Sequence, residues 1–503
     1  MTAVHGVDPR TGTPTGTPVT VTSGGDLDAL LAAAAAADTA GVLADPRVRI
    51  SLLNGLADDL DAAAGDLVPL AMAETGLPEA RLTGEVARTT GQLRLFAAVI
   101  ADGGYLDVVV DHADPAAAPP RPDLRRWLEP LGPVLVYAAS NFPFAFSVLG
   151  GDTASALAAG CPVLVKAHGG HPGTSAAVAA LAAGTVARLG LPAGVFALVV
   201  GDEQGVTALR DDRIAAAGFT GSTAGGRFLA GVAAARPRPV PFFGELGSVN
   251  PVVVTPGAVT ARGAGVVQGF VASMTLGTGQ FCTKPGLLFL PAGHGLDQAL
   301  ADAATAVAPA PLLNARIRDG LRSGLAGLAA HPAVQPLAAG PAASHDGSWA
   351  SAALFRTTAG AVVADPATLA EEYFGPNALV VEYSGEADLL AALSTIDGSL
   401  TATVHLEPGD DVDAVLAVLR RRTGRLIVNG WPTGVAVAWA MHHGGPWPAT
   451  TAPAYTSVGS AAIARWLRPV CYQDVPDALL PEPLRDANPW RLPRRVDGHH
   501  RSP

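Results

Sequence analysis

Apolar positions in residues 26–105 recur every three to four residues, as in LDALLAAAAAADTAGVLA and SLLNGLADDLDAAAGDLVPLAMAETG. This spacing puts apolar side chains on one face of a helix, so it predicts a helical segment. The alanine-rich run at residues 28–37 is short and bracketed by aspartates. We interpret it as an amphipathic helix and not as a membrane span. Residues 106–125 predict a short strand and then a connector rich in proline and alanine.

A different pattern begins near residue 131, where short apolar runs alternate with helical stretches. GPVLVYAA, CPVLVKAH and GVFALVVG predict strands, and DTASALAAG and SAAVAALAAGTVARLG predict the helices between them. ALRDDRIAAAGFTG predicts a helix that runs into a fourth strand, and AGGRFLAGVAAARP predicts another helix. Wholly apolar strands that alternate with helices are typical of a parallel, doubly wound sheet. Such sheets bind ligands at the carboxyl ends of their strands.

The alternation resumes after residue 245. NPVVVTP predicts a strand, VVQGFVASMT a helix and GLLFLPA a strand, and further strands are expected at FRTTAGAVVA, ALVVEY, TATVHL and RLIVNG. Beyond residue 450 the pattern is mixed, with RWLRPVCYQDVP strand-like and a Pro/Arg-rich end that we expect to be mobile. The pattern therefore predicts an α/β protein with two α/β domains, as its length of 503 residues also suggests.

Composition narrows the classes of partner and compartment. Hydrophobic residues make up 49% of the chain and the formal net charge is −11, which argues against nucleic acid and anionic membrane as partners. Cys161, Cys282 and Cys471 are too few and too scattered for a disulfide framework or a structural zinc site. With no signal-peptide pattern at the N-terminus, we expect a cytoplasmic protein.

Cys282 lies in the glycine-rich stretch TLGTGQFCTKPG. Gly277 and Gly279 allow the backbone to approach a substrate closely, and Lys284 offers a cation two residues away. A thiol becomes nucleophilic where a cation or backbone N–H groups lower its pKa, so Cys282 is a candidate nucleophile. The alternative is a half-buried, inert thiol.

Two polar residues could serve such a nucleophile. Glu245 follows Phe242, Phe243 and Gly244, and burial there is expected to raise its pKa toward that of a useful general base. The alternative is a strand-end glutamate paired with an arginine. Asn141 follows the strand GPVLVYAA, where its carboxamide can stabilise an oxyanion; the alternative is an Asx-turn residue.

Three further positions suggest a nucleotide site. Lys166 ends the strand CPVLVKAH and suits a ribose hydroxyl or a phosphate, unless it is a solvated charge. Gly221 and Ser222 lie between a strand and a helix, where N–H groups can hold a pyrophosphate, although the spacing is not G-x-G-x-x-G. Glu372 in LAEEYFGPN is the third position. The alternative interpretation is that it is only a carboxylate at the C-terminal end of a helix.

The remaining cysteines and several histidines are interpreted as structural. Cys161 begins a buried strand, where a thiol behaves as a small hydrophobe, and Cys471 is treated in the same way. No carboxylate or cysteine shares the spacing of the histidines. We therefore expect no metal site, and we interpret as loop residues His168, His171, His442 and His443.

Together, SNFPF, LVKAH, FTGSTAGG, FGELGSVNP, GQFCTKP, EEYFGP and NGWPTG resemble the aldehyde dehydrogenase superfamily, and they occur in that family's order. The resemblance covers roughly residues 20–475. Longer stretches such as RPRPVPFFGELGSVNP, GQFCTKPG, LIVNGWPTGVAV and AMHHGGPWPATT resemble one branch of the family. That branch contains 2-oxoglutarate semialdehyde (2,5-dioxopentanoate) dehydrogenases and NADP-dependent fatty aldehyde dehydrogenases.

For the fold, the resemblance implies a Rossmann-like doubly wound nucleotide-binding domain, a second α/β catalytic domain and a small β oligomerisation element. We assign the nucleotide-binding domain, with its N-terminal helices, to residues 1–117 and 131–244. Residues 245–450 form the catalytic domain. Residues 118–130 and 451–490 form the oligomerisation and bridging element and the tail. The family assembles as dimers or dimers of dimers, so we expect a homodimer or homotetramer in which PPRPDLRRWLEP and RWLRPVCYQDVP pair between subunits.

For the chemistry, the resemblance implies that Cys282 attacks an aldehyde to give a thiohemiacetal, whose oxyanion the Asn141 side chain and the Cys282 N–H stabilise. Hydride transfer to the nicotinamide leaves a thioester, and Glu245 activates the water that hydrolyses it. The cofactor-binding residues that it implies are Lys166, Gly169, Gly221, Ser222, Gly226, Glu372 and Phe374.

The resemblance leaves the cofactor open between NADP and NAD. Many NAD-using relatives have a glutamate where this chain has Gly169, so a carboxylate that would repel a 2′-phosphate is missing. NADP-binding relatives in the branch tend to have an arginine at the place of Gln204, which here follows Asp202 and Glu203. We expect NADP or dual use, with NADP favoured.

The substrate class also stays open. The leading expectation is 2,5-dioxopentanoate, which needs a cation for its carboxylate, and a medium- or long-chain aldehyde, which needs an apolar tunnel, is the alternative. A relative that passes the acyl group to coenzyme A is disfavoured by Glu245, and a non-catalytic relative by the intact set of site residues. The candidate cations are Arg81, Arg88 and Arg425, and the candidate tunnel residues are Phe142, Phe144, Phe146 and Trp439.

Overall fold

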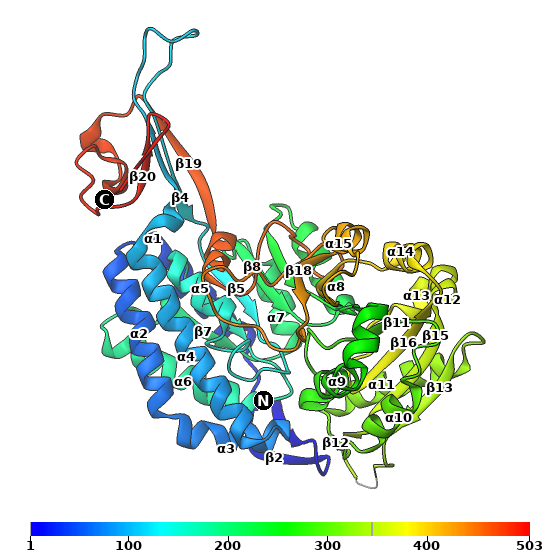
Figure 1. Ribbon diagram of the computed structural model, residues 1–503. Helices are drawn as coiled ribbons and strands as arrows, with labels where there is room; N and C mark the ends of the chain where they lie inside the picture. Colours follow the sequence, from blue (N-terminus) through cyan, green and yellow to red (C-terminus); the bar gives the residue numbers. More distant parts are fainter. Residues whose placement is uncertain (1, 344–345, 503) are drawn as a thin grey trace.

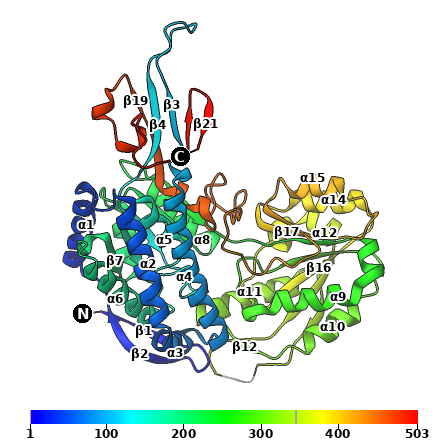
Figure 2. The ribbon, with the colours of Figure 1, turned by 60° about the vertical axis from the view of Figure 1, so that its left-hand side comes forward.

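The computed structural model describes residues 2–343 and 346–502, and it arranges them as two layered α/β regions with a narrow arm that projects from one of them (Figure 1). Figure 2 shows the second region beside the first, with helices above and below its sheet. Within this described part of the chain, no helix combines the length and apolar character that crossing a membrane requires.

The first region is built on a five-stranded parallel sheet in the order β7-β6-β5-β8-β9. Its strands are β5 (Val134–Tyr137), β6 (Val163–Lys166), β7 (Phe196–Val199), β8 (Ala216–Thr220) and β9 (Phe242–Glu245). The helices that alternate with them are α5 (Gly151–Ala159), α6 (Pro172–Arg188), α7 (Asp202–Arg210) and α8 (Thr223–Ala234). Every residue of β5 and β6 is buried, which explains the wholly apolar runs and confirms the predicted doubly wound sheet.

Four N-terminal helices cover this region: α1 (Gly24–Thr39), α2 (Pro46–Ala62), α3 (Ala64–Thr75) and α4 (Glu79–Asp102). The start of α2 is fixed by Pro46 at its first position and by Asp45, whose carboxylate accepts a hydrogen bond from the Arg47 N–H at 2.8 Å. Buried leucines of α2 and α4 pack against one another and against α5 and α6. The helical pattern predicted for residues 26–105 is therefore confirmed.

The second region contains a seven-stranded sheet in the order β13-β15-β16-β11-β10-β17-β18, parallel except for β13. Its strands are β10 (Val252–Val254), β11 (Leu287–Pro291), β13 (Gln335–Ala339), β15 (Ala353–Thr358), β16 (Asn377–Tyr383), β17 (Ser399–His405) and β18 (Thr423–Val428). Its helices are α9 (Pro256–Thr275), α10 (Asp297–Thr305), α11 (Ala315–Ala330), α12 (Ala359–Ala364), α13 (Pro366–Leu369), α14 (Glu386–Thr395) and α15 (Asp413–Leu419). Alternate strand residues face two separate cores, one shared with α9 and α10 and the other with α12, α14 and α15.

One predicted strand of this region is half wrong. FRTTAGAVVA forms β15 only as far as Thr358, and residues 359–364 form helix α12. The Thr358 hydroxyl caps that helix by accepting from the Ala361 N–H at 3.2 Å. Because a short apolar run has no clear period, its sequence does not separate a buried strand from a buried helix.

The arm is a five-stranded sheet in the order β19-β4-β3-β20-β21 (Figures 1 and 2). Its strands are β3 (Val108–Asp111), β4 (Leu124–Pro130), β19 (Leu467–Gln473), β20 (Arg494–Val496) and β21 (His499–Arg501). β4 and β19 pair antiparallel along their whole length within this one chain. The expected mobile C-terminal end is wrong, because β20 and β21 join the sheet and bury Leu480, Leu484 and Leu492.

The remaining elements are short. A hairpin that the sequence did not predict is formed by β1 (Ala3–Asp8) and β2 (Thr13–Thr20), and β12 (Ala310–Pro311) pairs with β14 (Trp349–Ala350). The 3₁₀ helices are η1 (Gly104–Leu106), η2 (Ala193–Val195), η3 (Leu276–Gly279), η4 (Ser460–Trp466), η5 (Asp477–Leu479) and η6 (Glu482–Leu484).

Candidate active site

Cys282 lies in a turn between η3 and β11, and it is half-buried. The chain reaches it through three residues with positive φ, Gly277 (56°), Thr278 (59°) and Gly279 (66°). A Cβ on Gly279 would lie 2.2 Å from the Gly375 carbonyl oxygen, so only glycine lets the two loops touch here. The glycines therefore fix the cysteine turn against the EEYFGP loop.

The Asn250 side chain holds the backbone of this turn through hydrogen bonds. Its Nδ2 donates to the carbonyl oxygens of Cys282 at 2.8 Å and Lys284 at 2.9 Å, and its Oδ1 accepts from the Thr401 N–H at 3.1 Å. Asn250 is completely buried and has a φ of 49°. The thiol is thus presented by a turn that neighbouring strands hold in place.

Glu245 is the last residue of β9, and its side chain is buried. Ser457 donates a short hydrogen bond to Glu245 Oε2. His443 Nε2 lies 3.0 Å from Glu245 Oε1. The carboxylate therefore has a partner on each oxygen.

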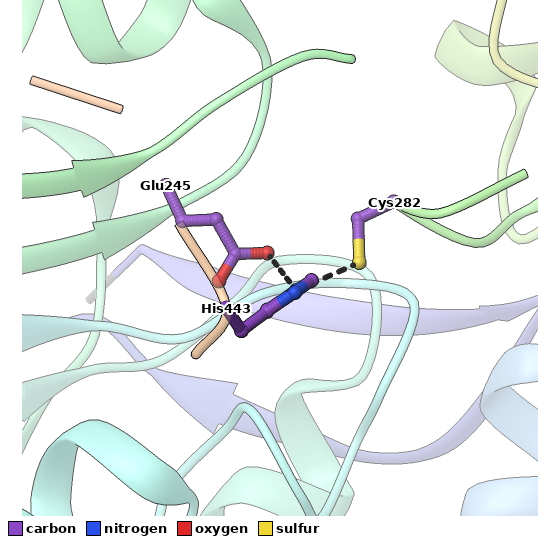
Figure 3. A group of neighbouring side chains, drawn as sticks. All are labelled: Glu245, Cys282 and His443. Atoms are coloured by element: carbon purple, nitrogen blue, oxygen red, sulfur yellow. Dashed lines mark hydrogen bonds and ion pairs between the residues drawn. The ribbon is translucent and has the colours of Figure 1, made fainter. Parts of the chain in front are cut away.

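His443 connects this carboxylate to the thiol. Its Nε2 lies 3.4 Å from Cys282 Sγ as well as 3.0 Å from Glu245 Oε1 (Figure 3). The imidazole is completely buried, and its backbone N–H donates to the Thr456 hydroxyl at 2.8 Å. Figure 3 shows the three side chains converging from three different segments.

The interpretation of His443 as a loop histidine with no site role is not supported by this geometry. His443 belongs to the segment between β18 and η4, which has little regular structure. No periodic pattern marks it, and its distance of 161 residues from Cys282 along the chain leaves no spacing to detect. Only its place in AMHHGGPWPATT, one of the stretches that carry the family resemblance, drew attention to this segment.

Two expectations about ionisation are wrong. Burial alone would raise the pKa of Glu245, but His443 and Ser457 outweigh burial and hold that pKa below its ordinary value. Burial raises the pKa of Cys282 well above its ordinary value, and the charges of Glu245 and Glu372 add to the rise. Lys284 does not lower it, because its ammonium points away to the carbonyl oxygens of Tyr373 at 3.1 Å and Asn377 at 2.9 Å.

Lys284 instead belongs with Glu372. Burial lowers the pKa of Lys284 and raises that of Glu372 to about 7, while the two charges oppose these shifts in each other. A small cavity is lined by both side chains together with Ser248 and Tyr373. Phe374 follows in the same loop and is half-buried. Glu372 is therefore a half-buried acid that can accept hydrogen bonds next to the cysteine turn.

Asn141 reaches the cysteine turn from the loop after β5. Its Nδ2 donates to the Gln280 carbonyl oxygen at 3.1 Å, which leaves one N–H of the carboxamide for another acceptor. In the described part of the chain, no group accepts a hydrogen bond from the Cys282 N–H. Two donors next to the thiol are therefore available to a further acceptor.

The remaining candidates lie at the carboxyl edge of the five-stranded sheet. Lys166 ends β6 and forms an ion pair with Asp202 at the start of α7. A Cβ on Gly169 would meet open space. Gly221 and Ser222 follow β8, and the Ser222 hydroxyl caps α8 by accepting from the Gly225 N–H at 3.3 Å.

Close packing against Leu246 explains why residue 226 is a glycine. A Cβ there would lie 2.0 Å from Leu246 Cδ2, so glycine lets α8 approach the residue that follows Glu245. Among the ten candidate residues, the structure brings Cys282, Glu245, Asn141 and Glu372 to one place, and Phe374 follows Glu372 in the same loop. It sets Lys166, Gly169, Gly221, Ser222 and Gly226 along the neighbouring sheet edge.

A cavity of about 20 Å³ lies beside Glu245 and His443, and Ser457, Thr450 and Tyr455 also line it. This volume is enough for a water molecule with several polar partners. The ligand atoms of Glu245, His443 and Cys282 lie within 4.8 Å of one another and are of the types that Zn²⁺ binds. The expected absence of a metal site stays a prediction.

Comparisons with known proteins agree on one family. The model of the aldehyde dehydrogenase family matches residues 2–446. A protein named alpha-ketoglutaric semialdehyde dehydrogenase 2 from Azospirillum brasilense is 50% identical over 458 residues, which are 90% of this chain and 87% of the relative. Alpha-ketoglutaric semialdehyde dehydrogenase from Acinetobacter baylyi is 43% identical over 456 residues, which are 90% and 86% of the two chains.

A solved structure gives the same fold at lower identity. Aldehyde dehydrogenase C from Pseudomonas syringae, in complex with NAD⁺ and octanal, superposes with a TM-score of 0.79 at 21% identity and covers 94% of each chain. The family resemblance inferred from the motifs is therefore confirmed, and so is the α/β fold class.

Proposed function

We propose that this chain, which belongs to the aldehyde dehydrogenase family, oxidises 2,5-dioxopentanoate to 2-oxoglutarate with NAD(P)⁺ as its cofactor. The names of the two relatives at 50% and 43% identity support this substrate, because alpha-ketoglutaric semialdehyde is 2,5-dioxopentanoate. The observation that carries the chemistry is the contact of His443 Nε2 with both Cys282 Sγ and Glu245 Oε1 (Figure 3).

In this mechanism Cys282 is the nucleophile. Because its pKa is raised, the thiol needs a proton acceptor at the moment of attack, and a neutral His443 imidazole, with its proton on Nδ1, can accept that proton at Nε2, 3.4 Å away. The imidazolium so formed carries the proton on Nε2 and faces Glu245 Oε1 at 3.0 Å. The oxyanion of the thiohemiacetal is stabilised by the free N–H of Asn141 Nδ2 and the Cys282 N–H. Bound NAD(P)⁺ supplies the acceptor for the hydride that leaves the substrate carbon.

Hydrolysis of the resulting thioester is the task of Glu245. Its lowered pKa keeps the carboxylate ionised at neutral pH, so it can accept a proton from water. The cavity of about 20 Å³ next to it has room for that water. Ser457 donates a hydrogen bond to Glu245 Oε2 and holds it in place. His443 Nε2 contacts the other oxygen, Oε1, and also the thiol sulfur of Cys282.

The residues at the sheet edge fit a dinucleotide. The first N–H groups of α8, next to the exposed Ser222, suit a pyrophosphate. Lys166 suits the adenosine ribose, and Glu372 is a half-buried acceptor for the nicotinamide ribose. Gly169 and Gly221 keep side chains out of this edge. We propose as cofactor-binding residues Lys166, Gly169, Gly221, Ser222, Gly226, Glu372 and Phe374.

We propose that NADP⁺ is preferred over NAD⁺, although no cationic side chain is assigned to bind its 2′-phosphate. Gly169 brings no carboxylate to the adenosine ribose and leaves open space, whereas the Asp202 carboxylate that pairs with Lys166 would repel a 2′-phosphate.

Replacing Asp202 by asparagine is therefore expected to lower the KM for NADP⁺ about tenfold relative to that for NAD⁺. Steady-state kinetics with both cofactors measures this ratio, and the exposed neighbour Glu203→Gln is the control. An unchanged ratio in Asp202→Asn would contradict this placement of the 2′-phosphate.

A medium-chain aldehyde is the second candidate substrate. The rings of Phe142, Phe146 and Phe281 pack together beside Cys282, with centroids 5.2 Å and 5.3 Å apart, and they can surround an alkyl chain. Phe144 is buried in the core of the first region and Trp439 is half exposed, so neither packs with these rings. A coenzyme A acceptor is disfavoured by the paired Glu245.

The test is an assay of the purified full-length protein with 2,5-dioxopentanoate, hexanal and pentanal, each with NADP⁺ and NAD⁺, followed by the absorbance of the reduced cofactor. We expect the highest kcat/KM for 2,5-dioxopentanoate and 2-oxoglutarate as the product. Higher kcat/KM for hexanal would favour the second candidate. No reduction with any aldehyde would refute the proposed function.

We also propose a homodimer or homotetramer in the cytoplasm. The arm extends away from both α/β regions (Figures 1 and 2), and an isolated sheet of this kind is stabilised by packing against a second copy. The three cysteines are unpaired thiols, which suits a reducing compartment. Light scattering on the full chain is expected to give two or four times its 50.6 kDa; a particle of one chain would contradict the proposal.

A further inference from the structure

Arg88 on α4 carries a guanidinium that has no hydrogen-bond or ion-pair partner among the described residues. Its Nε and Nη2 are buried, and they make no hydrogen bond to any residue of the described part. Among the ion pairs of the described residues, none involves Arg88. A buried guanidinium without a counter-charge is destabilising, because neither water nor a carboxylate compensates for its lost hydration. Such a group is therefore expected to have a function that retains it.

The side chains that contact the Arg88 guanidinium are aromatic, and Glu85 and Glu245 act on it through their charge without forming an ion pair with it. Its guanidinium carbon lies 5.1 Å from the centre of the Phe146 ring and 5.8 Å from that of Phe142. These faces attract a cation only weakly in comparison with an ion pair. Burial lowers the pKa of Arg88, and the opposing attraction comes first from Cys282 and then from Glu85 and Glu245. The charge of Arg88 is thus felt at the nucleophile.

The same rings place Arg88 at the approach to the thiol. Phe142 directly follows Asn141. Its ring packs edge-on against the ring of Phe281, the residue before Cys282, with the two ring centroids 5.3 Å apart. An aldehyde that reaches Cys282 beside these rings lies next to aromatic faces that the Arg88 guanidinium also contacts.

Two other arginines lie nearby, and each already makes hydrogen bonds to backbone carbonyl oxygens, although Arg81 Nη1 and Arg425 Nε have no partner among the described residues. Arg81 Nη2 donates to the Asn141 carbonyl oxygen at 2.7 Å, and its Nε lies 4.0 Å from Glu85. Arg425 donates through Nη1 and Nη2 to the carbonyl oxygens of Gly434 at 3.2 Å and Pro432 at 2.7 Å. Both arginines therefore hold loops, whereas the Arg88 guanidinium forms no hydrogen bond with any of residues 2–343 and 346–502.

We propose that Arg88 binds the carboxylate of the aldehyde substrate and selects acid semialdehydes over uncharged aldehydes of the same length. The proposal rests on the proposed aldehyde oxidation, and it assigns Arg88 a binding role, not one in bond making. The planar guanidinium offers two parallel N–H donors to the two carboxylate oxygens. An uncharged aldehyde leaves these donors unpaired in an apolar enclosure, which disfavours its binding.

The first test compares Arg88→Met with Arg94→Met. Methionine keeps an apolar stem, and Arg94 lies on the same helix but is half exposed and pairs with Asp58 and Asp61. The ratio of kcat/KM for 2,5-dioxopentanoate to that for pentanal is expected to fall about 100-fold in Arg88→Met, through a higher KM for the acid. Arg88→Lys is expected to restore part of the ratio, and Arg94→Met to keep it. Equal losses on both substrates would overturn the proposal, because they would mean that Arg88 only supports the fold.

The second test needs no aldehyde oxidation. Alkylation of Cys282 by anionic iodoacetate and by neutral iodoacetamide is followed by mass spectrometry of the peptide that contains Cys282. The rate ratio of iodoacetate to iodoacetamide is expected to fall about tenfold in Arg88→Met and to stay constant in Arg94→Met. An unchanged ratio in Arg88→Met would overturn the anion site. A wild-type protein that oxidises no aldehyde but shows this fall would refute the proposed function and leave the anion site standing.

Discussion

Replacing Cys282 by serine is expected to lower kcat/KM for 2,5-dioxopentanoate by about 10⁴-fold or more. A hydroxyl in the same place is far harder to deprotonate than a thiol, and its adduct is not a thioester. The measurement is steady-state reduction of NADP⁺ by wild type and variant at equal concentration. Cys471→Ser changes an exposed cysteine of the arm and is expected to retain full activity.

Folding must be separated from chemistry in this comparison. Asn250 and the positive-φ residues hold the cysteine turn through backbone groups, so serine at position 282 leaves these contacts in place. The thermal unfolding midpoint of Cys282→Ser is therefore expected to match that of the wild type. Activity above about 1% of the wild type in a correctly folded Cys282→Ser protein would remove Cys282 from the mechanism.

The raised pKa of Cys282 gives this prediction a pH dependence. Burial and the charges of Glu245 and Glu372 disfavour the thiolate, so the thiolate fraction in the free protein is small at neutral pH and grows as the pH rises. Alkylation of Cys282 by iodoacetamide is accordingly expected to be slow at pH 7 and to accelerate beyond pH 9. Fast alkylation that is independent of pH over this range would contradict the raised pKa.

The alternation of apolar strands and helices was sufficient to predict both α/β sheets, because burial on two faces demands wholly apolar strands. Lys166 was identifiable because it ends such a strand, and Asn141 because it lies in the loop that follows one. The C-terminal strands β20 and β21 were not predicted. Each has three residues; β20 is held by pairing with β3, a strand nearly 400 residues earlier in the chain, and β21 pairs with β20.

Only some residues of the site could be predicted from the sequence. Cys282, Glu245 and Asn141 stand in motifs, whereas His443 lies in an irregular segment and joins them only through the tertiary fold. The same omission explains the wrong expectation for the pKa of Glu245. Burial was inferred correctly from Phe242 and Phe243, but the sequence did not show that a buried histidine and Ser457 would contact both carboxylate oxygens.

Replacing Glu245 by glutamine is expected to lower kcat about 10³-fold while the first turnover persists. Glutamine keeps the shape of the side chain but cannot accept a proton from water, so the thioester on Cys282 accumulates. Rapid mixing is expected to show a burst of reduced NADP⁺ close to one per active site, followed by a slow steady rate. Mass spectrometry of the quenched protein is expected to place the acyl group on Cys282. A variant that loses the burst together with the steady rate would show that Glu245 also acts before the thioester forms.

His443→Gln provides the matched comparison, because His443 contacts both the thiol and Glu245. If Nε2 accepts the thiol proton, the burst itself slows in His443→Gln, in contrast to Glu245→Gln. The histidine also lowers the pKa of Glu245; without it, burial raises that pKa with less opposition. The carboxylate is then protonated at a higher pH, so the acidic limb of the kcat profile is expected to move to higher pH in His443→Gln. A fast burst with an unmoved acidic limb would show that the contact in Figure 3 is packing without a role in proton transfer.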